Sequence, residues 1–420
     1  MAEPVLDIVT QHAEEAAFLW HLRDLAVDRP YYATRHLVRL EERLEAHLDG
    51  LAEAGPIGFE AAQAQLDRHP EAGEAFTLAV LVLDARERDR LRALLELSAA
   101  EPATRRGLAG ALGWVEPRTL QGLVGPWLGS DEPLERWLGL VACSLHRVDP
   151  NDRLDRLLDD PNPSVRARAL RLVGELGRTA LRPRLLPALQ DSDPACRLWA
   201  AWSAVRLGES GPALAVLLEA AGRREPDGWP ALDLAVRALP VAEAAAWIRA
   251  LAGEPQQARR VIRALGALGD PAVVPWLVAR MDDPAVARLA GEAVSLITGV
   301  DLAFADLDRP PAEEPPAGPT DAPEDEDVAL DPDEHLPWPD RAKVEAWWAR
   351  ESGRFARGTR HLLGRPIGRE GCLRAFEEGF QRQRRAAALE LALMEPATPL
   401  RAWRARLVRR TRRPARERAA

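Results

Sequence analysis

The stretch that decides the fold runs from Leu154 to Gly208 and reads LDRLLDDPNPSVRARALRLVGELGRTALRPRLLPALQDSDPACRLWAAWSAVRLG. A short apolar segment ends at a turn with an acidic or amide residue and a proline, a second apolar segment follows, and the pattern repeats. Asn162-Pro163 and Asp193-Pro194 are equivalent points one period apart. Proline lacks a backbone N–H and therefore suits the first turn of a helix, where that donor would have no partner. The stretch predicts two successive pairs of short helices.

The same turn can be followed along much of the chain. Its prolines are spaced by 29 to 32 residues and are Pro70, Pro102, Pro133, Pro163, Pro194, Pro226, Pro255 and Pro284. Self-similarity at this period is typical of helical solenoids, in which neighbouring helix pairs share one core. The helix after Pro163 carries an apolar stripe at helical spacing, formed by Val165, Ala169, Leu172, Val173 and Leu176. We predict an all-α fold, an α-solenoid, with a distorted unit or a kink near Pro226, where the pattern weakens.

Chain length and composition predict several modules rather than one core. The chain has 420 residues, more than one compact domain usually holds, although a solenoid escapes this limit by growing lengthwise. The predicted parts are an N-terminal helical hairpin (1–55), the repeat solenoid (56–300), an acidic Pro-rich linker (301–340), a C-terminal helical module (341–400) and an Arg-rich tail (401–420). The module is expected to hold helices over 343–350, 373–380 and 381–394, with residues 354–367 irregular.

Net charge and cysteine spacing restrict the compartment and the classes of partner that the sequence predicts. The formal net charge of −9 argues against nucleic-acid binding over the whole surface. Cys143, Cys196 and Cys372 are far apart and odd in number, which indicates a reducing compartment without a disulfide framework or a zinc site. The chain opens without a signal peptide and has no apolar run of the roughly 18 residues that would span a membrane. We expect a cytoplasmic protein that needs no cofactor and does not bind a membrane.

The N-terminal hairpin carries a candidate metal site. We predict helices from about residue 5 to 27 and from about 33 to 51, and the buried stripe of the first is expected to include Ile8, Ala16, Leu19 and Trp20. Folding the hairpin about residue 29 brings His12 level with His47, and Glu15 lies one turn away. The three side chains form a candidate set of metal ligands. The favoured alternative is a histidine that bonds to glutamate and steadies the hairpin, because no His-x-x-x-His pair supports a metal.

Arginine recurs near the start of the second helices, and tryptophan recurs within the array. The arginines would lie along one edge of the solenoid and are Arg136, Arg166, Arg168, Arg197 and Arg288. In one interpretation they form a basic ridge for an acidic partner and are the candidate partner-binding residues. In the other they make structural bonds to neighbouring carbonyls and turn aspartates. The tryptophans fall in apolar helical registers, which favours a role in the core over a stacking surface for a peptide or bases. They are Trp114, Trp127, Trp137, Trp199, Trp202, Trp229, Trp247 and Trp276.

The last quarter of the chain has a strong charge asymmetry. Twelve acidic residues and a single basic one, Arg309, lie between Asp306 and Glu334, together with seven prolines from Pro310 to Pro332. Such a segment cannot form a packed core and is typical of a linker, although it would also suit masking of the basic C-terminal part. Trp338, between two prolines, is expected to anchor this linker on the next module and is a further candidate partner-binding residue. The tail Arg401–Arg418 holds nine arginines and one glutamate, so it either grips nucleic acid or an acidic protein face, or is a frayed end.

The residues from Asp160 to Gly177 resemble the HEAT-repeat superfamily at the turn, Val-Arg, Ala and Leu-Gly positions. Further pieces resemble an uncharacterised family of proteobacterial HEAT-repeat proteins over nearly the full length: QHAEEAAFLWHLRD (11–24), LEERLEAHLDGL (40–51), SLITGVDL (295–302), PEDEDVALDPDEHLPWPD (323–340) and GFQRQRRAAALELALMEP (379–396). Members of that family are often encoded near type VI secretion genes, which implies a cytoplasmic accessory or scaffold role. The resemblance implies no catalytic residues, and the Arg-rich tail departs from the family's pattern.

Two classes of function follow. The first is a non-catalytic scaffold or adaptor that binds a protein partner, because a solenoid offers a long surface and the sequence shows no nucleophile–base pair or Gly-rich phosphate loop. The second is a HEAT-like DNA-binding protein, through the Arg401–Arg418 tail, or an enzyme that removes alkylated bases from DNA. The enzyme would rely on the tryptophan set together with Asp191 and Asp193. A bilin lyase, with a pigment pocket, is a further HEAT-like enzyme class.

Overall fold

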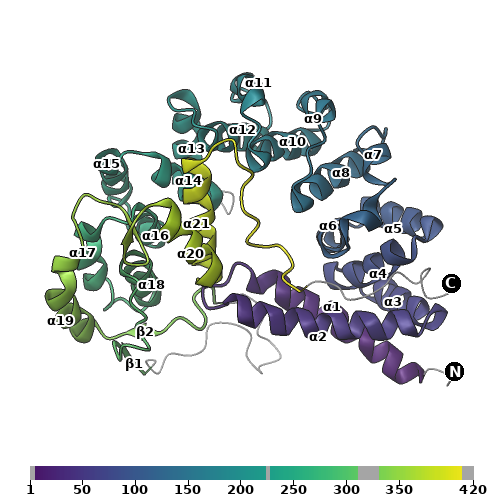
Figure 1. The fold of residues 1–420 in the computed structure, drawn as a ribbon, viewed down its shortest axis with the longest axis horizontal. Coiled ribbons are helices and arrows are strands. Elements are labelled where there is room, and N and C mark those ends of the chain that lie inside the picture. The colour runs from purple at the N-terminus through teal and green to yellow at the C-terminus, as the bar shows by residue number, and fades with distance from the viewer. Residues whose placement is uncertain (1–4, 224–227, 311–330, 409–420) are drawn as a thin grey trace. The chain divides into compact units, whose positions relative to one another are not determined.

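The computed structural model describes residues 5–223, 228–310 and 331–408, and in this part of the chain its regular structure is helical apart from two short two-stranded sheets. Figure 1 shows the elements. The chain forms two compact units. Unit 1 comprises Met1–Asp28, Tyr32–Leu207 and Ala397–Ala420, and unit 2 comprises Arg29–Tyr31 and Gly208–Pro396. This division by compactness falls inside the repeat array and groups the tail with the first hairpin, so it differs from the domain boundaries predicted from sequence.

The helices of unit 1 are α1 (Leu6–Ala26), α2 (Thr34–Glu53), α3 (Pro56–Arg68), α4 (Ala72–Ala85), α5 (Arg88–Ala100), η1 (Pro102–Thr104), α6 (Arg105–Trp114), η2 (Pro117–Leu120), α7 (Val124–Trp127), α8 (Pro133–His146), α9 (Asp152–Leu157), α10 (Pro163–Leu176), η3 (Thr179–Leu181), α11 (Arg182–Ala188) and α12 (Pro194–Arg206). The second helices of the pairs stack directly, α4 on α6, α6 on α8, α8 on α10 and α10 on α12. The predicted hairpin is confirmed as α1 packed against α2.

The elements of unit 2 are α13 (Pro212–Gly222), α14 (Gly228–Ala238), α15 (Val241–Leu251), η4 (Pro255–Gln257), α16 (Ala258–Leu268), η5 (Pro271–Val273), α17 (Val274–Ala279), α18 (Ala287–Thr298), β1 (Asp308–Arg309), β2 (Trp338–Pro339), α19 (Arg341–Glu351), η6 (Ser352–Arg354), β3 (His361–Leu362), β4 (Arg365–Pro366), α20 (Arg369–Glu378) and α21 (Gln381–Met394). Here α14, α16 and α18 form the stack, and α21 packs on α14. β1 pairs with β2 and β3 with β4, both antiparallel. The predicted helices of the C-terminal module are confirmed as α19, α20 and α21.

The turn chemistry expected from the sequence is confirmed most clearly at two points. Pro163 and Pro194 each occupy the first turn of a helix, α10 and α12. The Asn162 side chain accepts the N–H groups of Ser164 and Val165, and the Asp193 side chain accepts that of Cys196. These N-caps satisfy donors that a helix start leaves open. Pro133 likewise begins α8, and Pro102 and Pro255 begin the short helices η1 and η4. Pro70 and Pro284 stand in turns ahead of the helix, and Pro226 lies outside the described residues.

Burial confirms part of the predicted core and corrects one position. Trp114, Trp127 and Trp202 are buried, as a core role requires, whereas Trp276 is exposed. Ile8 was expected on the buried stripe of the first helix, and this is wrong, because its side chain is 53% exposed. The buried face of α1 runs through Val9, and a step of one residue turns a side chain by about 100° around a helix.

Within the described residues, no helix combines the length and the apolar character that a membrane crossing needs. The three cysteines are free and buried. Burial raises the pKa of the Cys143 and Cys372 thiols to about 11 and that of Cys196 to about 12. All three therefore stay protonated and unreactive at neutral pH.

Candidate functional site

The periodic arginines of unit 1 form a ladder with the turn aspartates of the following repeat. Arg136 donates to both carboxylate oxygens of Asp160, at 2.7 and 3.0 Å, and Arg166 does the same to Asp191, at 2.7 and 2.9 Å. Each pair joins one repeat to the next. The bond from Arg166 lowers the pKa of Asp191. Bidentate pairing of this kind is both strong and geometrically specific.

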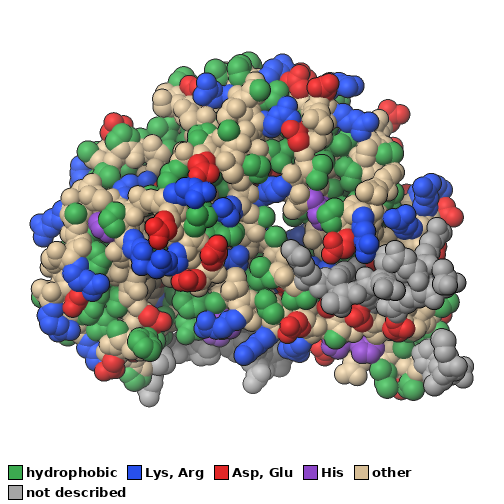
Figure 2. Space-filling model, viewed as in Figure 1, with side chains coloured by type: hydrophobic (Ala, Val, Ile, Leu, Met, Phe, Trp, Pro, Cys, Tyr) green, Lys and Arg blue, Asp and Glu red, His purple; other side chains and the backbone are tan. Residues whose placement is uncertain are grey.

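The same arginines also cap main-chain carbonyls of their own turns. Arg166 donates to the carbonyl oxygen of Asp160, and Arg197 donates to that of Asp191, each at 2.7 Å. The contacts match the structural interpretation of the arginines, in which they cap carbonyls and pair with turn aspartates. On the face drawn in Figure 2, acidic and basic side chains are correspondingly interspersed. A role of these arginines in partner binding stays a prediction.

Arg168 lies apart from this ladder, in a buried ion cluster at the end of α10. Its guanidinium is bonded to Glu175, which also accepts from Arg171 at 2.8 Å and from the Ser144 hydroxyl at 2.6 Å. Burial alone would raise the pKa of the Glu175 carboxyl. Arg168, Arg171 and Arg147 outweigh it and hold that pKa well below its ordinary value. Since Ser144 lies on α8 and Glu175 on α10, the cluster joins these two helices.

Arg288 and Trp338 lie together at the end of the array in unit 2. Arg288 donates to the Asp331 carboxylate at 2.6 Å and lies over the Trp338 ring, 4.6 Å from its centroid. The Asp331 carboxylate also accepts the N–H of Asp333, just as Asp160 accepts that of Asn162 in the array. Asp331-Pro332-Asp333 thus imitates a repeat turn and caps the last repeat. The described end of the acidic tract is therefore packed, while residues 311–330 lie outside the described part.

Replacing Asp331 should loosen this cap. We expect Asp331→Ala to lower the free energy of unfolding of unit 2 by about 1–3 kcal/mol, because it strands a mostly buried arginine and a main-chain donor. Urea unfolding followed by tryptophan fluorescence measures the change. Asp282→Ala is the matched control, because it removes an exposed ion pair to Arg341, which is worth little. An equal effect of the two substitutions would refute the capping role.

The structure brings His12 and His47 together but does not make a metal site of them. Their Nδ1 atoms are 3.0 Å apart, so one ring donates and the other accepts. Burial and the neighbouring His12 lower the pKa of His47, with Glu15 acting in the opposite direction. Among the described residues, no group of three or more His, Cys, Asp or Glu side chains is arranged to hold a metal ion.

The two carboxylates proposed for base removal have structural partners. Asp191 is held by Arg166, and Asp193 caps α12. The nearby Trp199 packs edge-on against Trp202, and the Arg171 guanidinium lies over the Trp199 ring, 4.2 Å from its centroid. These bonds and ring contacts give Asp191, Asp193 and Trp199 a structural role within the repeats and do not indicate a reaction.

The C-terminal segment Ala397–Val408 lies against the helices of unit 1. From the sequence, residues 401–420 were expected either to grip nucleic acid or an acidic protein face, or to be frayed. In its first half, the Leu400 N–H donates to the carbonyl oxygen of Glu175 at 2.8 Å, and Arg147 donates to the Leu400 carbonyl at 2.8 Å. Arg206, whose side chain is fully buried, donates to the Thr398 carbonyl. The segment therefore follows the C-terminal ends of α8, α10 and α12, where helices leave carbonyl groups without intrahelical partners. Figure 1 shows it as an extended yellow trace.

Gly177 shows how closely the segment approaches. It ends α10 with φ at +71°, and a Cβ atom there would lie 2.8 Å from the Ala397 carbonyl carbon. Both facts require glycine at this position. The segment thus has a preformed path on the repeats.

The second half of the C-terminal segment meets acidic side chains of α1 and α2. Arg404 pairs with Asp24 and Asp28, and Arg406 pairs with Glu45. Glu41 accepts the main-chain N–H groups at the next two positions of the segment. The acidic protein face that the tail was suggested to grip is thus present in the same chain. Residues 409–418 lie outside the described part, and nucleic-acid binding by the tail stays a prediction.

Sequence reasoning missed Glu41 and Glu45. The signal was present, because Glu41 interrupts the apolar stripe of α2 between Leu40 and Leu44 and is fully buried. A carboxylate inside such a stripe requires a partner. One partner of Glu41, Arg23, is 18 residues away, but Leu407 of the C-terminal segment is 366 residues away, so no local pattern identifies that contact.

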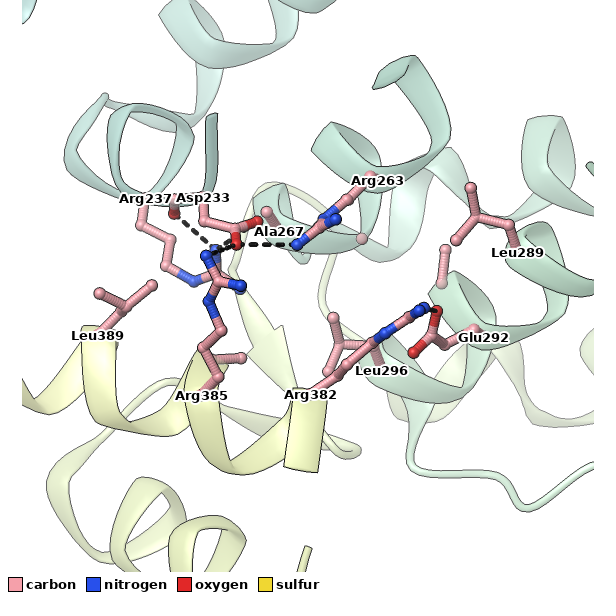
Figure 3. Close-up of a pocket in the computed structure, with 13 residues that line it drawn as sticks. Asp233, Arg237, Arg263, Ala267, Leu289, Glu292, Leu296, Arg382, Arg385 and Leu389 are labelled. Atoms are coloured by element: carbon pink, nitrogen blue, oxygen red, sulfur yellow. Dashed lines mark hydrogen bonds and ion pairs between the residues drawn. The ribbon is translucent and has the colours of Figure 1, made fainter. Parts of the chain in front are cut away.

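Unit 2 holds a second cluster, which the sequence did not suggest. Figure 3 shows Asp233 of α14 between Arg263 of α16 and Arg385 of α21, with N–O distances of 3.2 and 2.9 Å. Burial raises the pKa of this carboxyl, but the surrounding arginines, with Arg237, outweigh it and lower the pKa to about 2. The cluster joins two array helices to the C-terminal helix.

The cavity beside this cluster is small. It measures about 60 Å³, room for a few water molecules. At its rim Arg382 of α21 donates to Glu292 of α18 at 2.6 Å. Since the charges of its walls are paired with one another, the arrangement serves attachment of α21 rather than chemistry on a substrate.

An extended segment also follows helix ends in unit 2. The His361 N–H donates to the Gly269 carbonyl, and the Leu363 N–H donates to that of Leu296, each at 2.8 Å. Arg360 donates to carbonyl oxygens at the ends of α14 and α16. In both units, therefore, a stretch of chain runs along the C-terminal ends of stacked helices. Helix carbonyls bind it in both units, and arginine side chains at the helix ends also bind it in unit 1.

Comparison with known proteins supports one class. The family model for HEAT repeats matches residues 150–240. No curated protein and no solved structure gives a significant match. Fold and match together define an all-α helical-repeat protein with HEAT repeats, a type of scaffold able to mediate protein interaction.

Proposed function

We propose that this protein is a non-catalytic HEAT-repeat scaffold that binds a protein partner by holding an extended segment of polypeptide. The observation that carries the proposal is the C-terminal segment of unit 1, which is bound at the ends of α8, α10 and α12 by the main-chain carbonyl of Glu175 and by the side chains of Arg147 and Arg206. Main-chain recognition of this kind is indifferent to most side chains and therefore suits a scaffold.

The partner that we propose is a component associated with type VI secretion, and the compartment is the cytoplasm. Support comes from the resemblance of the motifs at 11–24, 40–51 and 323–340 to a family often encoded beside those genes. The HEAT match over 150–240 supports the scaffold part of the proposal.

The test is purification of the tagged full-length protein from its native cells, with quantification of co-purified proteins. We expect a partner in near-stoichiometric amount, and its identity tests the link to secretion. Recovery of the protein alone, together with unchanged secretion in a strain that lacks it, would reject the proposal. Release of bases from alkylated duplex DNA by the purified protein would contradict the non-catalytic role.

A further inference from the structure

An acidic site on α1, on α2 and in the turn after α1 binds the C-terminal segment, and its carboxylates are those of Asp24, Asp28, Glu41 and Glu45. Its best-defined contact is to Arg406, whose side chain is 7% exposed. The guanidinium donates to Glu45 and to the Trp114 carbonyl, each at 2.8 Å, and lies 4.5 Å from the centroid of the Trp114 ring. A planar guanidinium that is both stacked and bonded in this way cannot be replaced equally by lysine.

The wall of this pocket is positioned by the helices themselves. The Trp114 indole N–H donates to Glu45 at 3.0 Å, which joins α6 to α2. Glu41 is held from behind by Arg23, at 3.1 and 3.0 Å. The receiving side chains are therefore oriented by bonds that do not involve the C-terminal segment.

The site also sets the register and direction of the segment. The second carboxylate oxygen of Glu41 accepts the N–H groups of Leu407 and Val408, at 2.7 and 3.0 Å. Arg23 donates to the Arg404 carbonyl at 2.7 Å, and the Leu407 side chain packs against the apolar core of unit 1. The required pattern is Arg-x-Arg followed by an apolar residue, entered through a turn in which the Ala405 N–H donates to the Ala402 carbonyl.

We propose that this acidic site is a docking site for an Arg-x-Arg segment of a protein partner, and that the chain's own Arg404-Ala405-Arg406-Leu407 holds the site until the partner replaces it. The inference rests on the proposed scaffold function and specifies the partner's chemistry. Asp24, Asp28 and Glu45, whose carboxylates pair with guanidinium groups, disfavour nucleic acid and match a basic peptide. A tethered segment acts at an effective concentration in the millimolar range, so a free peptide binds weakly until the tether is released.

The experiment uses the full-length chain and a fluorescein-labelled peptide of residues 399–408, PLRAWRARLV. In the double variant Arg404→Glu/Arg406→Glu, the chain's own segment is repelled, and we expect the peptide to bind at least ~10-fold more tightly than to the wild type. Fluorescence anisotropy gives the affinity, and circular dichroism verifies that the variant is folded. The matched control peptide carries glutamate in place of Arg404 and Arg406 and is expected not to bind.

A charge exchange tests the pocket itself. Adding Glu45→Arg to the double variant should abolish binding of the arginine peptide, because Arg406 of the peptide loses its carboxylate partner and the chain's own segment, with glutamate at position 406, can pair with the new arginine. Should the double variant fail to fold, wild-type protein titrated with peptide into the millimolar range answers the same question. Saturable binding of the arginine peptide, without binding of the glutamate peptide, supports the proposal.

Equal binding of the two peptides, or equal affinity of the wild type and the folded double variant, would overturn the inference. A concentration-dependent dimer of the wild type that Glu45→Arg abolishes would assign the site to a second copy of this chain and overturn the partner assignment. If the native partner co-purifies equally with the wild type and the double variant, the scaffold function stands and this site is not its docking point.

Discussion

Asp233→Asn is expected to lower the free energy of unfolding of unit 2 by about 3–5 kcal/mol, since removal of one member of a buried ion network leaves the others uncompensated. Asp233 is the shared carboxylate of Arg263 and Arg385, and its side chain is 9% exposed. The amide keeps the shape of the carboxylate, so packing contributes little to the effect. Urea unfolding of the full-length chain, followed by tryptophan fluorescence, measures the change.

The matched control is Glu219→Gln, which removes an exposed ion pair to Arg223 on α13 of the same unit. Such a pair contributes about 0–1 kcal/mol. A loss at Asp233 no larger than that of the control would show that the cluster does not hold α21 on the array.

The same group sets an acid limit on stability. Its pKa is lowered from 3.8 to about 2 in the folded protein, so its contribution is fully present above pH 3.8 and is lost as the pH falls through about 2. The difference in stability between wild type and Asp233→Asn should therefore shrink over that interval. A difference that stays constant down to pH 2 would contradict the ionised state of the carboxyl.

Gly107→Ala is expected to destabilise unit 1 by about 3 kcal/mol or more. The new methyl group would overpack the contact between two helices, and the cost is high because backbone atoms cannot move aside as a flexible side chain can. A Cβ atom at Gly107 would lie 1.8 Å from the Ala72 carbonyl oxygen and 2.8 Å from the Phe76 nitrogen. Both are backbone atoms of α4, so α4 and α6 would have to separate, and with them the Phe76 and Trp114 rings, which pack edge to face.

Thermal and urea unfolding of the variant measure this effect, with Gly129→Ala as the control. At Gly129 the nearest atom to a new Cβ would be 3.8 Å away, an ordinary contact, so we expect a change within about 0.5 kcal/mol. Unchanged stability of Gly107→Ala would mean that the two helices pack less closely than the structure shows.

What the sequence by itself determined is the repeat. The prolines, the capping Asn162 and Asp193, and the apolar stripe after Pro163 act within one or two helical turns, so their pattern is visible along the chain and predicts the helix pairs. The extent of α1 and α2 and of the C-terminal helices could be predicted for the same reason. Even here, Ile8 shows that the exact buried face depends on which neighbours a helix meets.

What only the tertiary structure decided is which charges meet. Glu41 and Leu407 are 366 positions apart, and Asp233 and Arg385 belong to different segments of unit 2. In a chain with many arginines and one lysine, every carboxylate has numerous candidate partners, and local spacing does not choose among them. The choice is made by burial, because a carboxylate removed from water is stable only where the folded chain brings a guanidinium or an N–H group within bonding distance.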